Sequence, residues 1–376
     1  MSVKIAPIIK NALSFSIAPL IPLMERAPVS GFTGELLKTI AAARREDVTQ
    51  ELYDTWRYPN GAPARQNSTQ ASKHLAYFLL NFRKLNDCAE NLADHTSKNM
   101  LKQLLALRTL GLRKICPPVD VSHMLKNYAL AQECQTGSSK ISFGPFEFAK
   151  YLVPFEGQFV NFDGWLGNVA ATFFTRQYYF ERNNINISPK AGDIVIDAGA
   201  CFGDTALAFA ITVGPQGRIY SFEPMPDQRK VFETNMAGNP DIQKTIELFE
   251  WALDSRSGRT LRFSKSGAAS RISKESGEFA VETITIDDFV SKFELPRVDF
   301  IKMDIEGAES SALAGAAETI RKFKPRLAIS AYHSLHDLVG LIGKIQEIDI
   351  KYRFYFDHHS THYEETILYA VSSVVA

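Results

Sequence analysis

The spacing of apolar residues divides the chain into two regions near residue 140. Before that point, apolar residues recur three and four positions apart, as in Leu75–Leu85, which is the period of one helix face. A second helix is predicted from about Ser97, with Gly111 as its stop signal. We therefore expect a mainly helical region over residues 1–140, with a linker at Tyr58–Gln70, where proline, glycine and polar residues gather.

From Pro189 onward, short apolar runs alternate with helical stretches, which indicates a parallel sheet with helices on both faces. The last two runs are too close for a helical crossover, so the final strand is expected to run antiparallel to its neighbours. Two other runs, Thr260–Phe263 and Val281–Ile286, suggest an inserted hairpin. The expected strands of the sheet are Asp193–Asp197, Arg218–Phe222, Ile246–Trp251, Val298–Met303, Arg326–Ser330, Tyr352–Phe356 and Thr366–Val371.

Residues 141–180 are rich in aromatic side chains, from Phe143 through Trp165 to Phe180. Such a cluster can be a packed junction between two domains. It can also form a wall over a cofactor or substrate, and the sequence leaves both interpretations open. We assign this segment to the second domain, which is expected to cover residues 141–376.

The composition is that of an ordinary globular protein. The 376 residues are enough for two domains, and 45% of them are hydrophobic and 22% charged. The 42 basic and 42 acidic side chains balance, so the net charge does not favour a nucleic-acid partner. The four cysteines form no C-x-x-C pair, which favours neither a zinc site nor a disulfide framework. Prolines break the apolar stretch Ile5–Met24, so we expect no signal peptide, no stable membrane insertion and a cytoplasmic location.

The segment Asp193–Thr205 contains the most informative motif. An apolar strand ends in Asp197, and a turn containing Gly199 and Gly203 leads into a helix. Glycine at such a turn lets the backbone bend sharply and approach a ligand. Asp197 and Asp204 place carboxylates beside the turn, and these suit a ligand that carries a sulfonium and an ammonium group.

The ends of the later strands carry further candidate residues. Glu223 ends the second strand, where an acid can bind ribose hydroxyls, and Trp251 ends the third strand, where an adenine is expected. Asp304 ends the fourth strand, which is expected to lie next to the first, and His333 follows the fifth. Because the ligand crevice of a doubly wound sheet lies at the carboxyl ends of its strands, these residues are expected to surround one site.

With these motifs, the chain resembles the FkbM-type methyltransferase family from about Phe173 to Tyr369. The resemblance implies a class I methyltransferase fold, which is Rossmann-like, with a seven-stranded, mostly parallel sheet whose last strand is antiparallel. It also implies methyl transfer from S-adenosylmethionine, usually to a hydroxyl of a sugar or natural product. The segments that carry it are Ile196–Thr205, Phe222–Pro224, Lys302–Glu309 and Glu365–Tyr369.

We therefore expect an O-methyltransferase whose acceptor is a carbohydrate or other small molecule. Asp304 and His333 are the candidate general bases because of their positions, and the resemblance assigns neither role. No metal is assigned, although the late histidines, His358, His359 and His362 among them, leave a divalent cation open. The residues expected to bind the cofactor are Asp197, Gly199, Ala200, Gly203, Asp204, Thr205, Glu223, Trp251 and Ala252.

Two other functions are compatible with parts of the pattern. A nicotinamide-dependent oxidoreductase is disfavoured because Cys201 and Asp204 stand where its second and third motif glycines belong. A scaffold that binds the cofactor without catalysis would keep the fold and lose transfer. The helical region over residues 1–140 is expected to cover the acceptor or to form a contact between copies of the chain.

Overall fold

The computed structural model describes residues 31–43, 68–143, 146–264, 271–272 and 279–374. Its central sheet has seven strands in the order β15-β16-β14-β13-β6-β7-β8. β16 is antiparallel to both of its neighbours, and the other neighbouring strands are parallel. The predicted mixed sheet is therefore confirmed. Its strands are β6 (Ile194–Ala198), β7 (Arg218–Phe222), β8 (Ile246–Phe249), β13 (Phe300–Met303), β14 (Arg326–Ser330), β15 (Tyr352–His358) and β16 (Thr366–Ser372).

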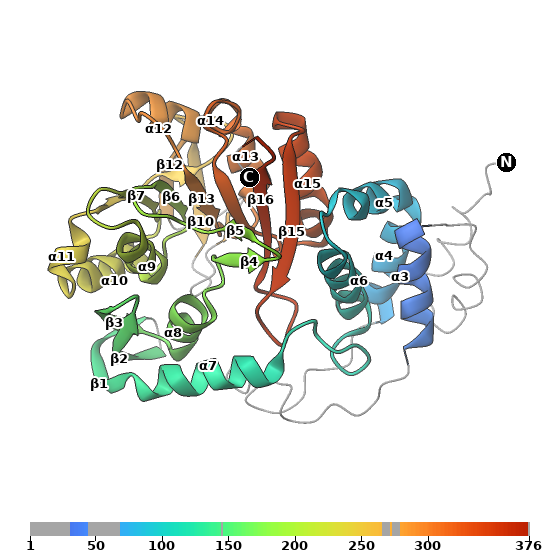
Figure 1. Cartoon of the computed structure of the whole chain (residues 1–376), viewed down its shortest axis with the longest axis horizontal. Coiled ribbons are helices and arrows are strands. Elements are labelled where there is room, and N and C mark those ends of the chain that lie inside the picture. Colours follow the sequence, from blue (N-terminus) through green and yellow to red (C-terminus); the bar gives the residue numbers. More distant parts are fainter. Residues whose placement is uncertain (1–30, 44–67, 144–145, 265–270, 273–278, 375–376) are drawn as a thin grey trace.

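Helices cover both faces of this sheet (Figure 1). Successive residues of a strand point to opposite faces, so Ile194 and Ile196 of β6 join one hydrophobic cluster and Val195 joins the other. The first cluster contains side chains of α12 (Ile286–Lys292), α13 (Glu309–Ala314), α14 (Ala317–Phe323) and α15 (Leu335–Ile348). The second contains side chains of α9 (Asp204–Val213) and α10 (Pro226–Ala237), which is followed by α11 (Pro240–Gln243).

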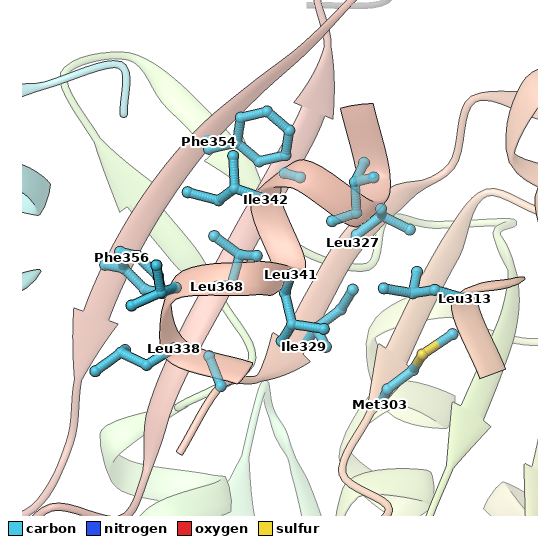
Figure 2. Packing of buried hydrophobic residues seen from close by; sticks show 14 of the residues in the cluster. Met303, Leu313, Leu327, Ile329, Leu338, Leu341, Ile342, Phe354, Phe356 and Leu368 are labelled. Atoms are coloured by element: carbon cyan, nitrogen blue, oxygen red, sulfur yellow. The ribbon is translucent and has the colours of Figure 1, made fainter. Parts of the chain in front are cut away.

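The packing of α15 shows how one helix face closes this core. Leu338, Leu341 and Ile342 recur on one face of α15 and are at most 2% exposed. They lie against apolar residues of β14, β15 and β16, among them Ile329 and Leu368 (Figure 2). A helix whose apolar residues form a single stripe must bury that stripe against another element, and here the sheet is that element.

The helices before residue 112 belong to the same core as the sheet. They are α3 (Gly31–Ala42), α4 (Ser68–Leu80), α5 (Phe82–Asn91) and α6 (His95–Leu110). They lie beside α15 and the edge strand β15 (Figure 1), and Ser97 Oγ accepts a 2.9 Å hydrogen bond from the Phe356 amide. Leu101, Leu104 and Leu105 are completely buried in the cluster that contains Ile196. Within the described ranges before residue 112 the chain is helical as predicted, and the predicted stop at Gly111 is confirmed.

The aromatic segment forms a small antiparallel sheet that the sequence pattern did not predict. After α7 (Val121–Glu133) it comprises β1 (Gln135–Phe143), β2 (Phe146–Phe155) and β3 (Gln158–Gly164). The predicted division at residue 140 falls within β1. The ring of Phe148 packs edge-on against Trp165 and Phe202, with centroids 5.4 and 5.1 Å away. The aromatic residues therefore join this sheet to the α9 side of the central sheet.

Shorter elements complete the described chain. The inserted hairpin is confirmed, because β10 (Thr260–Ser264) pairs antiparallel with β12 (Phe279–Ile284). β12 also pairs with β9 (Ala252–Leu253), so the third strand of the central sheet stops at Phe249 instead of Trp251. The remaining elements are α8 (Leu166–Val169), the π-helix η3 (Ala170–Thr175), β4 (Phe180–Arg182), β5 (Ile185–Ile187) and β11 (Arg271–Ile272).

Two sequence predictions fall outside the described residues. These are the apolar stretch Ile5–Met24 and the linker at Tyr58–Gln70, apart from its last three residues, which begin α4. In the ranges that are described, no helix has the length and apolar character needed to cross a lipid bilayer.

The shared core predicts that the N-terminal helices and the sheet unfold together. We expect Leu104→Ala to lower the free energy of unfolding by ~2–5 kcal/mol, because it leaves a cavity in this core. The midpoint of urea unfolding should shift by the same amount whether it is followed by circular dichroism or by tryptophan fluorescence. Leu80→Ala, at a side chain 69% exposed, is the control and should change stability by less than ~0.5 kcal/mol. Two separate transitions in the Leu104 variant would contradict a common core.

Candidate active site

A cavity of about 1030 Å³ opens at the carboxyl ends of β6, β7, β13 and β14. The small sheet forms a second wall through Tyr151 and Trp165, so the aromatic segment both packs and lines the cavity. The loop after β15 contributes residues 359, 360 and 362–365, and α6 contributes Arg108. The guanidinium of Arg108 donates to the backbone carbonyls of Tyr332 and Tyr363. The N-terminal helices therefore contact the cavity through the Arg108 side chain.

A buried ion pair lies beneath the cavity floor. Lys302 Nζ lies 3.1 Å from Asp197 Oδ1, and the two side chains are 2% and 0% exposed. The ammonium also donates to the carbonyl of Gly199 at 2.7 Å. Burial alone would lower the pKa of Lys302, but the carboxylates of Asp197 and Asp304 raise it above the ordinary value. The Lys302 ammonium thus keeps its charge, and its contacts join β13 to the turn after β6.

Two buried carboxyl groups lie on one side of the cavity. Glu223 accepts hydrogen bonds from the amides of Cys201 and Met225, both at 2.9 Å, and Asp204 accepts one from the Thr172 hydroxyl. Burial raises the pKa of Glu223 to about 7 and that of Asp204 to about 6. Both groups line the cavity. Because burial destabilises their charged forms, a cation bound beside them would stabilise the carboxylates.

Apolar side chains line the cavity beyond Glu223. They belong to Met225, Trp251, Leu253 and Phe263. The indole of Trp251 stacks on Phe249 with ring centroids 5.6 Å apart. This part of the cavity can hold a flat apolar ring next to the Glu223 carboxylate.

At the opposite side of the turn, Asp304 is held by two tyrosines. Its Oδ2 accepts a 2.8 Å hydrogen bond from Tyr178, and its Oδ1 accepts one of 3.1 Å from Tyr332. The Asp304 amide donates to Ala198 at 3.0 Å, which fixes the backbone against the end of β6. Sequence reasoning missed Tyr178, which lies in the aromatic segment far from any strand motif.

His333 lies among three carboxylates. Its Nε2 is 3.4 Å from Asp304 and 3.5 Å from Glu306, and its Nδ1 is 3.2 Å from Glu309. Burial would lower the pKa of His333, but the three acids outweigh it and raise the pKa to about 9. The imidazole therefore carries a proton at neutral pH and cannot accept another one.

The other late histidines contact different partners. His358 Nδ1 lies 2.8 Å from the Thr366 hydroxyl, and His359 Nε2 lies 3.0 Å from the Tyr369 hydroxyl. Burial lowers the pKa of His358 to about 3. His362 interacts with Ser360 across a tight turn. Burial also lowers the pKa of His359, so His358 and His359 are neutral parts of the loop packing.

The structure brings most of the predicted site residues to one cavity. Asp197 is not among the lining residues because Lys302 occupies its carboxylate, and Gly203 faces Phe232 of α10. At Gly199 a Cβ atom would lie 1.8 Å from the Asp304 carbonyl oxygen, so this glycine permits contact between two backbones. The predicted residues that line the cavity are Gly199, Ala200, Asp204, Thr205, Glu223, Trp251, Ala252, Asp304 and His333.

Known sequences match this part of the chain. Residues 197–362 match the family model of the methyltransferase FkbM domain. The 2-O-methyltransferase NoeI of Sinorhizobium fredii is 29% identical over 38% of this chain and 64% of its own length. The hexuronic acid methyltransferase AglP of Haloferax volcanii is 26% identical over 34% of this chain and 52% of its own. The chain thus matches less than two thirds of either relative.

The arrangement of elements also occurs in a solved structure. The methyltransferase FkbM from Methylobacillus flagellatus aligns with 81% of this chain and 63% of its own, with a TM-score of 0.51 and 20% sequence identity. At this identity the likeness shows a common fold and does not identify a substrate.

The buried ion pair predicts a large effect of removing one partner. Lys302→Met should lower the free energy of unfolding by ~3–5 kcal/mol, because it leaves the Asp197 charge buried without a cation. Adding Asp197→Asn should recover at least half of that loss. Urea denaturation at neutral pH measures both. Lys344→Met, which removes an exposed partner of Glu347, is the control and should cost less than ~1 kcal/mol. If Lys302→Met and Lys344→Met were equally stable, the structural role of the Lys302–Asp197 ion pair would be refuted.

Proposed function

We propose that the chain transfers a methyl group from S-adenosylmethionine to a hydroxyl oxygen of a sugar or glycosylated acceptor, because residues 197–362 match the family model of the methyltransferase FkbM domain. The observation that carries the proposal is the single cavity in which Glu223 and Asp304 lie on either side of the turn after β6. The strand order, with its antiparallel last strand, supports a class I, Rossmann-like methyltransferase domain. The two curated relatives support a sugar acceptor by their names.

The Glu223 side of the cavity fits S-adenosylmethionine. The Glu223 carboxylate is held by two amides at the ends of β6 and β7, in reach of a ribose, and the apolar pocket around Trp251 suits an adenine. Burial raises the pKa values of Glu223 and Asp204, so both acids would be stabilised as carboxylates by the ammonium and sulfonium of the cofactor. An NAD pyrophosphate would instead meet these acids, which disfavours the oxidoreductase.

The Asp304 side fits the acceptor. When bound, the cofactor supplies an electrophilic methyl group, and the acceptor oxygen must approach it opposite the sulfur. We assign the removal of the hydroxyl proton to Asp304, whose carboxylate lines the cavity and is positioned by Tyr178 and Tyr332. The protonated state of His333 favours Asp304 over His333 as the base, and we assign to His333 the positioning of Asp304.

The N-terminal helices complete the acceptor side in this proposal. Arg108 of α6 holds the carbonyls of Tyr332 and Tyr363, which belong to two loops of that wall. We propose that the helices fix these loops and do not bind the cofactor. Any contact between copies of the chain would use other faces of the helices.

The raised pKa of Glu223 gives a pH dependence for cofactor binding. The neutral acid dominates below about pH 7 and the carboxylate above it, so affinity for the cationic cofactor should rise about five- to tenfold from pH 6 to 7.5. Calorimetry of S-adenosylmethionine binding measures this. Glu223→Gln should bind more weakly at pH 7.5 and show a smaller rise, whereas Glu247→Gln, on the neighbouring strand and exposed, should match the wild type. Equal pH slopes in all three proteins would remove Glu223 from the site.

The reaction itself is tested with sugar and glycolipid acceptors, followed by mass spectrometry for an added methyl group. Asp304→Asn should lower turnover at saturating cofactor by ~10²-fold or more and leave cofactor affinity within about twofold. Asp241→Asn, an exposed carboxylate on α11, is the control. Near-normal turnover in Asp304→Asn would exclude it as the base. Cofactor binding without transfer to any acceptor would favour the scaffold.

A further inference from the structure

Three side chains at the acceptor side converge from two strand ends and a helix. Asp304 follows β13, Glu309 begins α13 and His333 follows β14. One oxygen or nitrogen from each lies within 4.8 Å of the other two. Ligands of one octahedral ion at ~2.1 Å lie about 3–4 Å from each other, so small side-chain adjustments would bring these atoms into a coordination shell.

The charges in this cluster do not balance. Asp304, Glu306 and Glu309 surround one imidazole, so acidic groups outnumber basic groups around His333. In the described part of the chain, neither Asp304 nor Glu309 has a lysine or arginine at ion-pair distance. A divalent cation would add positive charge to this acidic cluster.

The buried members of the cluster also have polar atoms that make no hydrogen bond. The Glu309 side chain is completely buried, and only its Oε1 has a hydrogen bond, from the Ile305 amide at 2.9 Å, whereas Oε2 has none. The His333 side chain is 6% exposed, and neither of its ring nitrogens makes a hydrogen bond of good geometry. Buried polar atoms of this kind call for a partner, and a cation is one that all of them could share.

Access to the cluster is through the cavity. Asp304 and His333 line the cavity, while Glu309 lies behind them. An ion held there would have protein ligands on its inner side and open positions toward the cavity, which is the arrangement of a catalytic rather than a structural metal.

We propose that Asp304, Glu309 and His333 bind one divalent cation at the acceptor side of the cavity, and that the ion displaces one proton from the His333 imidazole. Two carboxylates and one imidazole suit Mn²⁺, which accepts both oxygen and nitrogen ligands. The ion's binding follows from the cluster alone. Its role rests on the proposed function: it would polarise the acceptor hydroxyl and make the loss of its proton easier.

To test this, metal is first removed from the full chain with a chelator. The protein is then titrated with Mn²⁺, without cofactor or acceptor. Bound Mn²⁺ loses the sharp spectrum of the free ion in electron paramagnetic resonance, so the spectrum counts binding sites without any turnover. We expect one site per chain. Asp304→Asn and His333→Gln should each weaken binding about tenfold or more, since each removes a ligand.

Glu364→Gln is the matched control. Glu364 lines the same cavity but lies outside the cluster, so this variant should bind Mn²⁺ as the wild type does. Thermal unfolding of all variants checks that they are folded. The proposal would be overturned if the wild type bound no Mn²⁺. It would also be overturned if the wild type, Asp304→Asn and His333→Gln bound Mn²⁺ with equal affinity.

Calorimetry with S-adenosylmethionine on the same samples separates this inference from the proposed function. If the protein bound S-adenosylmethionine but not Mn²⁺, the metal site would be contradicted and the proposed methyltransferase function would stand. Mn²⁺ binding that depends on Asp304 and His333, without cofactor binding, would support the ion site and contradict the methyltransferase.

Discussion

The buried ion pair between Lys302 and Asp197 is the constraint on which the geometry of the site depends. It joins neighbouring residues of β13 and β6, and the same ammonium holds the carbonyl of Gly199. The cofactor-side turn and the strand that ends in Asp304 are thereby fixed to each other. In the proposed reaction, the cofactor side and the acceptor side of the cavity therefore take their relative position from one buried cation.

The two sides of the cavity differ in how they treat negative charge. At Glu223 and Asp204, burial raises the pKa values to about 7 and about 6. At Asp304 the carboxylate receives two tyrosine hydroxyls and lies beside a charged imidazole. The first side favours a cationic ligand, and the second side places Asp304 among hydrogen-bond donors, where we propose that it acts on the acceptor.

The sequence predicted what local patterns encode. Apolar runs located the strands, and because parallel strands end at one edge, Glu223 and Asp304 could be placed in one crevice. The role of Asp197 as a cofactor ligand remains a prediction, and its contact with Lys302 could not be read from the sequence because it depends on strand register. The sheet from β1 to β3 was not predicted because aromatic residues on both faces hide its alternation. The charge of His333 depends on three acids that only the fold brings together.

The core shared by α6 and the last strands has a consequence for synthesis on the ribosome. The Ser97 hydroxyl meets Phe356 across 259 residues of chain, so the apolar face of α6 is made long before the strand that covers it. At about 5–20 residues per second, this interval is roughly 13–50 s. During that time α3 and α4 can already contact α6, but the side of α6 that packs on β15 still lacks its final partner.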